Sequence, residues 1–396
     1  MTWVGGAAGS GYGVEHLPLG ATDNGLWVRV GDRALDLGAA EERGLVHAGG
    51  ALWEPTLNRL LAAGPGTWRS LRARLTELFT DPAHRDAIEP LLVPVDALAL
   101  RLPFDVADYV DFYSSEAHAT NVGHIFRPDQ AALLPNWKHL PVAYHGRAGT
   151  VVVSGTEVTR PCGQRKPPGA DAPVYGPSTR LDIEAEVGFV VGTPTTLGSR
   201  VSTSDFARHV FGVVLVNDWS ARDIQAWEYQ PLGPFLGKSF ATSVAAWVTP
   251  LDALAAARVP APAQDPEVLG YLHEDDRAGY DLRLEVEWNG TVVSRPPFAG
   301  MYWTPAQQLA HLTVNGARLR TGDLYASGTV SGSARDQTGS FLELTWGGRD
   351  PVTLADGSAR TFLDDGDRVT IRATAPGPDG TTLALSEVSG TVGPAS

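Results

Sequence analysis

The segment RLDIEAEVGFVVG, residues 180–192, constrains the fold most, because it has the alternation of a β-strand and carries three acids on one face. Its apolar side chains alternate and form the other face of the predicted strand. The acidic face carries, in order, three acids, a glycine and a valine: Asp182, Glu184, Glu186, Gly188 and Val190. Carboxylates held close together repel one another. The fold must therefore either expose these acids or compensate their charge.

Two interpretations of this acidic face are open. The acids could be solvated on a half-exposed strand. The small apolar end of the same face favours a partly covered surface, where carboxylates must be paired, protonated or bound to a metal. Side chains two residues apart on a strand lie about 6.6 Å apart at Cα, so two glutamates can converge on one cation. The second interpretation predicts a metal site to which other segments contribute ligands.

Composition argues against several classes of function. The 396 residues carry a formal net charge of −14 and no basic run, which disfavours nucleic acid and anionic membranes as partners. The single cysteine, Cys162, allows neither an intrachain disulfide nor a thiolate zinc site. No signal-peptide pattern is seen at the start, and no apolar run approaches the ~20 residues of a membrane span. We expect a cytoplasmic enzyme or binding protein.

Two regions of the chain differ in their patterns. Residues 1–103 contain GLWVRVGDRALDLG, a predicted hairpin with its turn at Gly31-Asp32, and TWRSLRARLTELF, a predicted amphipathic helix. From residue 104 onwards short β segments dominate: TVVVSG, VFGVVLVND, LRLEVEWNG, GSFLELTW and GDRVTIRAT. SARDIQAWE and TPAQQLAHLTV are the clearest helical patterns there. The sequence thus predicts a small N-terminal unit and a rolled or barrel-like β domain with minor helices.

The polar segment DYVDFYSSEAHATNVG carries three candidate functional residues: Asp111, Tyr113 and His118. Its crowded polar side chains and proline-rich flanks predict a loop, and loops carry function disproportionately. A lone histidine is more often structural than catalytic. The segment is therefore either an ordinary surface loop or part of a site.

A second candidate segment begins with an apolar strand over residues 210–216, with Asp218 at its end. A helix is predicted next, with Asp218 or Ser220 as its N-cap. One face of that helix would present a cation, an amide and a phenol: Arg222, Gln225 and Tyr229. Such a face is more typical of a binding wall than of a core, although capping alone would also explain Asp218.

Glu343 in GSFLELTWGG is predicted to lie on a strand, with Leu342 and Leu344 pointing the other way. It could face solvent or orient a histidine, as a carboxylate does in a catalytic triad. Together the segments supply a set of oxygen ligands that favours Mg²⁺, Ca²⁺ or Mn²⁺ over Zn²⁺: Asp111, Glu184, Glu186 and Asp218. His118, backed by Glu343, could be a general base. Three side chains could stabilise a developing oxyanion: Arg222, Gln225 and Lys238.

Six long runs carry a resemblance to a known family: DYVDFYSSEAHATNVGHIFRP, LLPNWKHLPVAYHGRAGTVVVSGT, LDIEAEVGFVVG, LVNDWSARDIQAWEYQPLGPFLGKSFATSV, MYWTPAQQLAHLTVNGARLRTGDLYASGTVSG and GSFLELTWGG. They span most of residues 104–346, in family order, and HLPLGA near the N-terminus is a fainter match. The sequence closely resembles the fumarylacetoacetate hydrolase family, of the fumarylacetoacetase type. One departure is Ala241, which stands where glycine is expected and could crowd the pocket.

The resemblance implies a mainly β (α+β) subunit with a small SH3-like barrel over residues 1–103 and a larger mixed β-roll over residues 104–396. It also implies a homodimer. It implies Ca²⁺ or Mg²⁺ on Asp111, Glu184, Glu186 and Asp218, and a second Mg²⁺ assignment that involves Asp218, Lys238 and Thr242. His118 matches the catalytic base, and Asp182 matches no ligand. Six residues match substrate-binding positions: Tyr113, Arg127, Tyr144, Gln225, Tyr229 and Thr329.

The implied reaction is hydrolysis of the carbon–carbon bond of 4-fumarylacetoacetate to fumarate and acetoacetate, the last step of tyrosine and phenylalanine degradation. The metal would act as a Lewis acid on the diketo acid, while His118 and Glu343 activate water. One alternative is a related diketo-acid hydrolase of the acylpyruvate type, which the N-terminal unit and the PLGPFLGKSF context disfavour. The other is a non-catalytic metal-bound homologue, which the intact His118, Glu343 and Lys238 disfavour.

Overall fold

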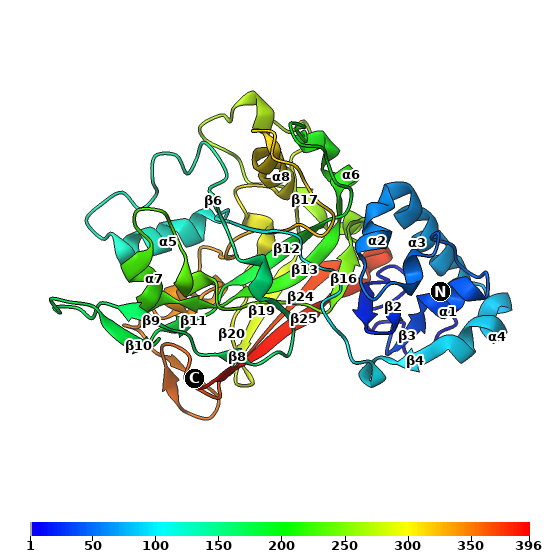
Figure 1. Cartoon of the computed structure of the whole chain (residues 1–396), viewed down its shortest axis with the longest axis horizontal. Coiled ribbons are helices and arrows are strands. Elements are labelled where there is room, and N and C mark those ends of the chain that lie inside the picture. The colour runs from blue at the N-terminus through cyan, green and yellow to red at the C-terminus, as the bar shows by residue number, and fades with distance from the viewer. Residues whose placement is uncertain (1) are drawn as a thin grey trace.

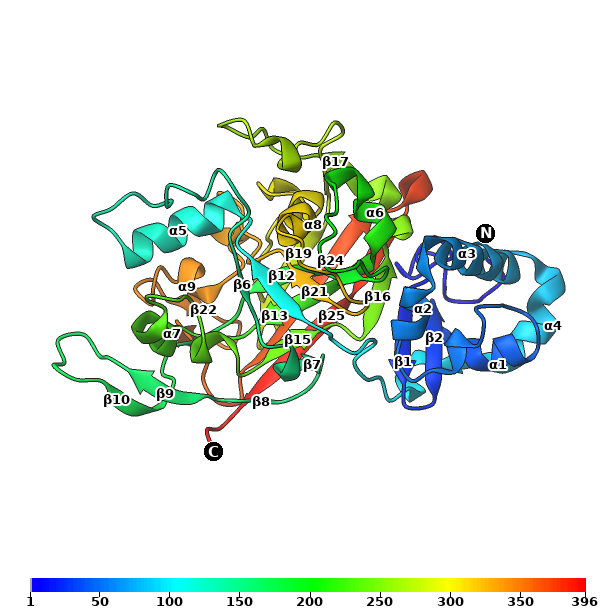
Figure 2. The ribbon, with the colours of Figure 1, turned by 45° about the horizontal axis from the view of Figure 1, so that its top comes forward.

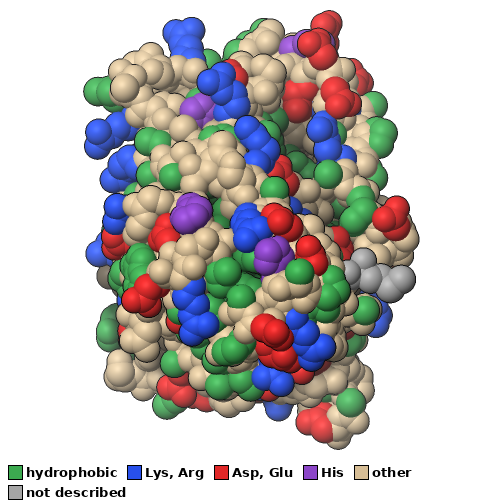
Figure 3. All heavy atoms as spheres, turned by 90° about the vertical axis from the view of Figure 1, so that its right-hand side faces the viewer, with side chains coloured by type: hydrophobic (Ala, Val, Ile, Leu, Met, Phe, Trp, Pro, Cys, Tyr) green, Lys and Arg blue, Asp and Glu red, His purple; other side chains and the backbone are tan. Residues whose placement is uncertain are grey.

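The computed structural model describes residues 2–396, which form a small N-terminal domain and a larger mixed-sheet domain (Figure 1). This confirms the predicted fold class. Figure 3 shows the molecule from the N-terminal end, where acidic and basic side chains are interspersed. In the part of the chain that is described, no helix combines the length and the apolar character needed to cross a membrane.

The N-terminal region is an antiparallel sheet covered by short helices. Its strands are β1 (Leu19–Thr22), β2 (Gly25–Val30), β3 (Arg33–Asp36) and β4 (Leu92–Pro94). The predicted hairpin is confirmed, because β2 pairs with β3 across the Gly31-Asp32 turn. Its helices are α1 (Leu37–Glu42), α2 (Asn58–Ala62), α3 (Gly64–Thr80) and α4 (Arg85–Ile88). Helix α3 confirms the predicted amphipathic helix, with Leu71, Leu75, Leu78 and Phe79 buried.

One strand pair joins this region to the rest of the molecule. Strand β1 pairs antiparallel with β16 (Trp247–Pro250), so the two regions share a 12-stranded sheet. Next to this junction, the ring of His16 is buried between Gly11 and Thr249. The main path of the sheet runs in the order β4-β3-β2-β1-β16-β13-β12-β21-β5-β6.

The centre of the sheet positions the candidate site. Its strands here are β5 (Tyr109–Phe112), β6 (Ala143–His145), β7 (Val151–Val153), β12 (Ala185–Val191), β13 (Val210–Asp218), β15 (Thr242–Val244) and β21 (Leu324–Ala326). Strand β12 pairs antiparallel with β13 and β21, and β21 pairs parallel with β5. Strands β12 and β13 are buried along their whole length. Acids near the ends of three strands are thereby brought together in the interior: Asp111, Glu186 and Asp218.

A second sheet packs against the first one, with β25 alongside β13 (Figure 1). It contains β20 (Thr291–Ser294), β19 (Arg283–Trp288), β24 (Arg368–Pro376), β25 (Thr382–Gly393) and β8 (Val158–Thr159). The two-stranded ribbons are β9 (Cys162–Arg165) with β10 (Val174–Pro177), β11 (Leu181–Asp182) with β14 (Ser220–Ala221), β17 (Arg258–Pro260) with β18 (Ala278–Tyr280), and β22 (Val352–Thr353) with β23 (Ala359–Arg360).

The helices of the larger domain are α5 (Glu116–Phe126), α6 (Phe206–His209), α7 (Arg222–Glu228), α8 (Pro305–Thr313) and α9 (Phe341–Leu344). Helices α7 and α8 confirm the two clearest helical patterns. Helices α5 and α9 lie side by side, with α7 on the same side of the sheet (Figure 2).

The structure decides between the two interpretations of the acidic segment, because Asp182, Glu184 and Glu186 are all buried and the solvated alternative is excluded. The prediction of one continuous strand was wrong, since the chain leaves the ladder between β11 and β12. The carboxylate of Asp182 accepts a hydrogen bond from the backbone N–H of Ile183, which replaces a ladder bond at the break.

Three further local predictions were wrong. The polar segment around His118 is not a loop but strand β5 followed by α5, whose N-cap Ser115 accepts a hydrogen bond from the His118 N–H. Glu343 lies on helix α9 rather than on a strand, because Ser340 caps that turn. Helix α7 starts after Ala221 without a side-chain cap, so Asp218 and Ser220 stay in strands.

Candidate active site

Four buried carboxylates converge at the centre of the large domain. One oxygen from each lies within 4.8 Å of the others. They come from β5, from the break before β12, from β12 itself and from the end of β13: Asp111, Glu184, Glu186 and Asp218. The convergence of two glutamates two residues apart with acids from other segments is the arrangement that the sequence predicts.

Lys238 compensates part of this charge. Its ammonium lies 2.7 Å from Glu184 Oε2 and 2.5 Å from Asp218 Oδ2, and it donates to Ser220 Oγ at 2.9 Å. Burial alone would lower the pKa of Lys238, but Asp218 and Glu184 raise it above its ordinary value. A charged ammonium has three donors and no lone pair. Lys238 therefore spends its three donors within the site and acts as a counter-ion, not as a direct ligand of a cation.

Asp218 receives two further hydrogen bonds from residues that the sequence singled out. Tyr144 donates its hydroxyl to Asp218 Oδ2 at 2.9 Å, and Thr242 donates to Oδ1 at 3.1 Å. Burial raises the pKa of Asp218, and Lys238 opposes that rise. Tyr144 and Thr242 thus hold one carboxylate of the cluster in a fixed orientation.

The rest of the acidic cluster is incompletely compensated. Among the residues that the structure describes, no hydrogen-bond partner reaches either carboxylate oxygen of Glu186 or Oδ1 of Asp111. Burial raises the pKa of Glu186, and the neighbouring Asp111 raises it further. Burial likewise raises the pKa of Asp111, with Asp218 as the next cause. Buried carboxylates without donors fit a hard divalent cation, whose oxygen ligands they would be.

A histidine–glutamate pair lies at the side of this cluster. His118 of α5 places its Nδ1 2.6 Å from Glu343 Oε2 of α9. Asn121 donates to the other carboxylate oxygen at 3.0 Å, and Ser331 and Ser340 donate to Oε2 at 3.0 and 2.8 Å. Burial alone would raise the pKa of Glu343, but His118 lowers it below its ordinary value. Because the carboxylate accepts the Nδ1–H, the lone pair of the imidazole is on Nε2.

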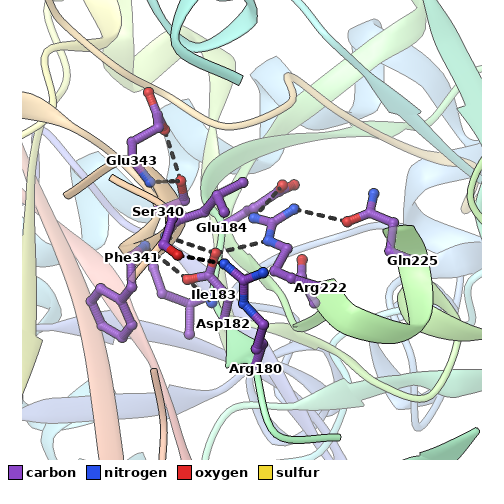
Figure 4. A network of polar contacts seen from close by, with 12 residues as sticks. Arg180, Asp182, Ile183, Glu184, Arg222, Gln225, Ser340, Phe341 and Glu343 are labelled. Carbon is purple, nitrogen blue, oxygen red and sulfur yellow. Dashed lines mark hydrogen bonds and ion pairs between the residues drawn. The ribbon is translucent and has the colours of Figure 1, made fainter. Parts of the chain in front are cut away.

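Arg222 connects the acidic cluster with the start of α9. Its Nε donates to Asp182 Oδ2 at 2.8 Å, and its Nη2 forms an ion pair with Glu184 Oε1 at 2.8 Å. Its Nη1 donates to Gln225 Oε1 at 3.1 Å (Figure 4). Burial alone would raise the pKa of Glu184, but Lys238 and Arg222 lower it below its ordinary value. Arg222 also compensates the charge of Asp182, the third acid of the segment.

A pocket of about 370 Å³ opens onto these groups. Ten of the predicted site residues line it: Asp111, Tyr113, His118, Arg127, Tyr144, Glu184, Arg222, Gln225, Tyr229 and Lys238. Five others do not belong to its described lining: Glu186, Asp218, Thr242, Thr329 and Glu343. Ala241 is buried in the apolar core and is likewise absent from that lining, so the expected crowding of the pocket by its methyl group is not supported.

Sequence reasoning missed several residues of the site. Asn121, Ser331 and Ser340 all donate to Glu343, and Ser220 accepts from Lys238. One signal could have found Ser340, because SFLE has the S-x-x-E spacing typical of a helix start. Asn121 lies one turn after His118 on α5, so it could have been found only if that helix had been predicted.

Fold and site together define an enzyme of mixed-sheet fold, in which an acidic cluster able to hold a metal ion lies beside a histidine–glutamate pair. The chain belongs to the fumarylacetoacetate hydrolase family. Residues 15–103 match the family model "Fumarylacetoacetase N-terminal", and residues 109–384 match "Fumarylacetoacetate (FAA) hydrolase C-terminal".

Curated relatives match along the full length. Fumarylacetoacetase of Homo sapiens is 43% identical over 419 aligned positions, which cover 100% of this chain and 99% of the relative. The Arabidopsis thaliana fumarylacetoacetase is 43% identical, with 93% and 90% covered. The Dictyostelium discoideum protein of the same name is 37% identical, with 98% and 96% covered.

Solved structures share the fold at low sequence identity. A fumarylacetoacetate hydrolase from Exiguobacterium antarcticum has a TM-score of 0.56 at 16% identity, covering 96% of this chain and 99% of that one. Maleylpyruvate hydrolase from Sphingobium sp. SYK-6, solved with manganese(II) and pyruvate, has a TM-score of 0.54 at 17% identity, covering 96% and 100%.

Proposed function

We propose that this enzyme hydrolyses the carbon–carbon bond of 4-fumarylacetoacetate, giving fumarate and acetoacetate, the last step of tyrosine and phenylalanine degradation. The geometric observation that carries the proposal is the buried acidic cluster beside the His118–Glu343 pair, both bordering one pocket. The choice of substrate rests on the full-length similarity to curated fumarylacetoacetases.

The proposed metal is Ca²⁺ or Mg²⁺, held by the four carboxylates of the cluster: Asp111, Glu184, Glu186 and Asp218. Lys238 and Thr242 would support Asp218 from behind, through the contacts described above. When bound, the ion would polarise the oxygens of the diketo acid as a Lewis acid. Glu186 is the ligand that gains most, because within residues 2–396 its two oxygens have no other partner.

His118 is the proposed general base. Its Nε2 accepts a proton from a water molecule in the pocket, and the oxygen of that water attacks the substrate carbonyl. Glu343 holds the imidazole in the tautomer with hydrogen on Nδ1 and offsets the positive charge that forms. The carbon–carbon bond to the attacked carbonyl carbon then breaks, and the imidazolium gives its proton to the carbon of the leaving acetoacetate. The second proton of the water is released when the new carboxylic acid of fumarate ionises.

Substrate binding and charge stabilisation are assigned to the pocket wall. Arg222 has five N–H donors, of which Nε–H donates to Asp182 and one on Nη1 donates to Gln225. Its Nη2 forms an ion pair with Glu184 but no hydrogen bond within the described residues, so donors remain for a developing oxyanion. Gln225, whose amide oxygen accepts from Arg222, keeps its NH₂ for the substrate. Tyr113, Arg127 and Tyr229 of the pocket wall are further proposed to bind the substrate. Thr329 lies outside the described lining, and its proposed role in substrate binding rests on the family resemblance alone. Lys238 and Tyr144 are proposed to act through Asp218.

The test is an ultraviolet assay of 4-fumarylacetoacetate decay with the purified protein. The sample is measured as isolated, after chelation, and after Mg²⁺, Ca²⁺ or Mn²⁺ is restored. We expect decay that chelation abolishes and metal restores, with fumarate and acetoacetate as products. A folded, metal-loaded sample that leaves the substrate intact would refute the substrate assignment. The same sample should then be tested on acylpyruvates, the substrates of the alternative diketo-acid hydrolase.

Three features rest on the family resemblance and stay proposals. We propose a division into domains at residues 1–103 and 104–396, which the separate matches to residues 15–103 and 109–384 support. We further propose a homodimer, which light scattering coupled to size exclusion would test. The third proposal is a cytoplasmic location, which fractionation of the source cells would test.

A further inference from the structure

Asp182 is the one acid of the segment RLDIEAEVGFVVG to which no role in metal binding is assigned, yet its side chain is fully buried. Each of its two carboxylate oxygens accepts two hydrogen bonds. Oδ1 accepts from the backbone N–H of Ile183 at 2.8 Å and of Phe341 at 2.7 Å. Oδ2 accepts from Arg222 Nε at 2.8 Å and from the N–H of Leu342 at 3.0 Å.

We propose that Asp182 is a positioning residue that locks Arg222 and the start of helix α9 in one relative arrangement, so that both sides of the pocket are aligned by a single carboxylate. The inference rests on the proposed function, because it assigns roles to Arg222 and to Glu343 in that reaction. Asp182 itself touches neither the pocket nor the acidic cluster's central oxygens, so it acts through these partners.

The first branch of the arrangement fixes the guanidinium of Arg222. Its Nε–H points to Asp182, and its two other nitrogens contact Glu184 and Gln225. A planar guanidinium held at three nitrogens has no freedom to rotate. The direction of its remaining donors is therefore set by Asp182 together with the acidic cluster (Figure 4).

The second branch fixes helix α9. The N–H groups of Phe341 and Leu342 start this short helix and have no intrahelical acceptor, and the Asp182 carboxylate satisfies both. Glu343 follows directly, and Ser340 both caps its N–H and donates to its Oε2. A shift at the start of α9 would therefore displace the carboxylate that holds the imidazole of His118.

The chemistry of the four donors explains why the residue is an aspartate. Four N–H groups point at the two oxygens, and only a carboxylate accepts on both sides. An asparagine would turn its NH₂ towards two of these donors and leave them without an acceptor. In Asp182→Asn one branch must therefore open, whichever way the amide is turned.

The kinetic test compares Asp182→Asn with Asp223→Asn. Asp223 neighbours Arg222 in sequence, but it bonds to Ser178 and Thr179 instead. We expect Asp182→Asn to lower kcat about 10- to 100-fold while KM for 4-fumarylacetoacetate changes less than about 3-fold. The Asp223→Asn control should keep kcat and KM within about 2-fold of wild type. A kcat loss in Asp182→Asn no larger than in the control would overturn the proposal.

Double variants separate positioning from general destabilisation. If Asp182 acts through Arg222 and Glu343, its substitution should cost less in the Arg222→Ala background and in the Glu343→Gln background than in wild type. If Asp182→Asn lowered kcat by the same factor in both backgrounds as in wild type, Asp182 would act independently of the two residues. That result would also overturn the proposal.

A measurement on the wild-type enzyme covers the case in which Asp182→Asn does not fold. In a ¹⁵N-arginine-labelled sample, the Nε–H signal of Arg222 is assigned by its absence from Arg222→Lys. We expect this proton to exchange with water at least about 100-fold more slowly than those of exposed arginines. Exchange as fast as that of exposed arginines would refute the proposal that Asp182 fixes Arg222. If the wild type lacks turnover, the proposed function fails, and this measurement still decides the role of Asp182.

Discussion

Glu186 and Glu343 are both buried glutamates of the same site, but their surroundings differ. Glu343 accepts hydrogen bonds from His118, Asn121, Ser331 and Ser340. Glu186 has none from any residue of the described chain. The pKa shifts point in opposite directions: burial raises the pKa of Glu186, whereas at Glu343 the effects of His118, Asn121 and Ser340 together outweigh burial and lower the pKa.

The chain completes one part of the site by itself and leaves the other part to a bound cation. A carboxylate surrounded by donors is stable as an anion without any added group. A buried carboxylate without donors is costly unless it is protonated or binds a cation. We therefore expect the His118–Glu343 pair to be formed in the metal-free protein, and the acidic cluster to be completed by the metal.

The largest expected effect is on catalysis at the completed pair. His118→Ala should lower kcat by about 10²- to 10⁴-fold, because the general base is lost. The affinity for Mn²⁺, measured by calorimetry, should stay close to that of wild type, since His118 is not among the four converging acids. His124, exposed on the same helix, provides the control variant His124→Ala. Parallel loss of turnover and metal binding would show that His118 is structural.

Glu343→Gln should have a smaller effect on the same pair. The amide keeps the shape but cannot offset an imidazolium, and its NH₂ would meet groups that now donate to the carboxylate. We expect kcat to fall about 10- to 100-fold and the thermal midpoint of the chelated protein to drop. An unchanged kcat would mean that Glu343 does not orient the imidazole.

Glu186→Gln makes the same change in the acidic cluster, which the metal is expected to complete. It should weaken Mg²⁺ or Mn²⁺ binding at least about 10-fold, because a charged ligand is replaced by an amide. The thermal midpoint of the chelated protein should not drop, since no donor within the described residues loses an acceptor. A lower midpoint together with unchanged metal affinity would reverse the comparison between the two glutamates.

The contrast also explains what could be predicted from the sequence. Alternation predicted the buried strand before Asp218 correctly, because that pattern is local and periodic. It also found strand character in residues 180–192, but it missed the break between β11 and β12 in which Glu184 lies. It misplaced Glu343, because the apolar alternation of SFLEL fits a strand as well as one helical turn. The N-cap residue Ser340 favours the helix, but a single capping residue is a weaker sequence signal than a periodic apolar pattern.

Partners across the chain could not be predicted from the pattern. Glu343 meets His118 across 225 positions, and Asp182 meets the start of α9 across about 160. Such contacts depend on the order of strands in the sheet, which places β5 and β12 on either side of β21. The family resemblance supplied the expected roles of single residues, but it contained no partner for Asp182.

His16 is a third buried titratable group, and both hydrogen-bond partners of its ring are neutral. Its Nδ1 lies 3.0 Å from the Gly11 carbonyl oxygen, and its Nε2 lies 2.9 Å from the Thr249 hydroxyl at the junction of the two regions. Burial lowers the pKa of His16 to about 3, which the Gly11 carbonyl only partly opposes. Unlike His118, it has no carboxylate to stabilise a charged ring.

This shift makes the junction sensitive to acid, with the smallest expected effect. Between pH 6.5, the ordinary value, and about 3 the unfolded chain binds one more proton than the folded chain. The free energy of unfolding therefore rises with pH in this window, and the contribution is lost as pH falls. From about pH 7.5 to about pH 5 wild type should lose roughly 2 kcal/mol more than His16→Gln, measured by urea unfolding. The exposed His47 supplies the control His47→Gln, which should follow wild type. If His16→Gln lost as much unfolding free energy as wild type over this pH range, the His16 ring would be protonated in the folded protein, despite its burial between neutral partners.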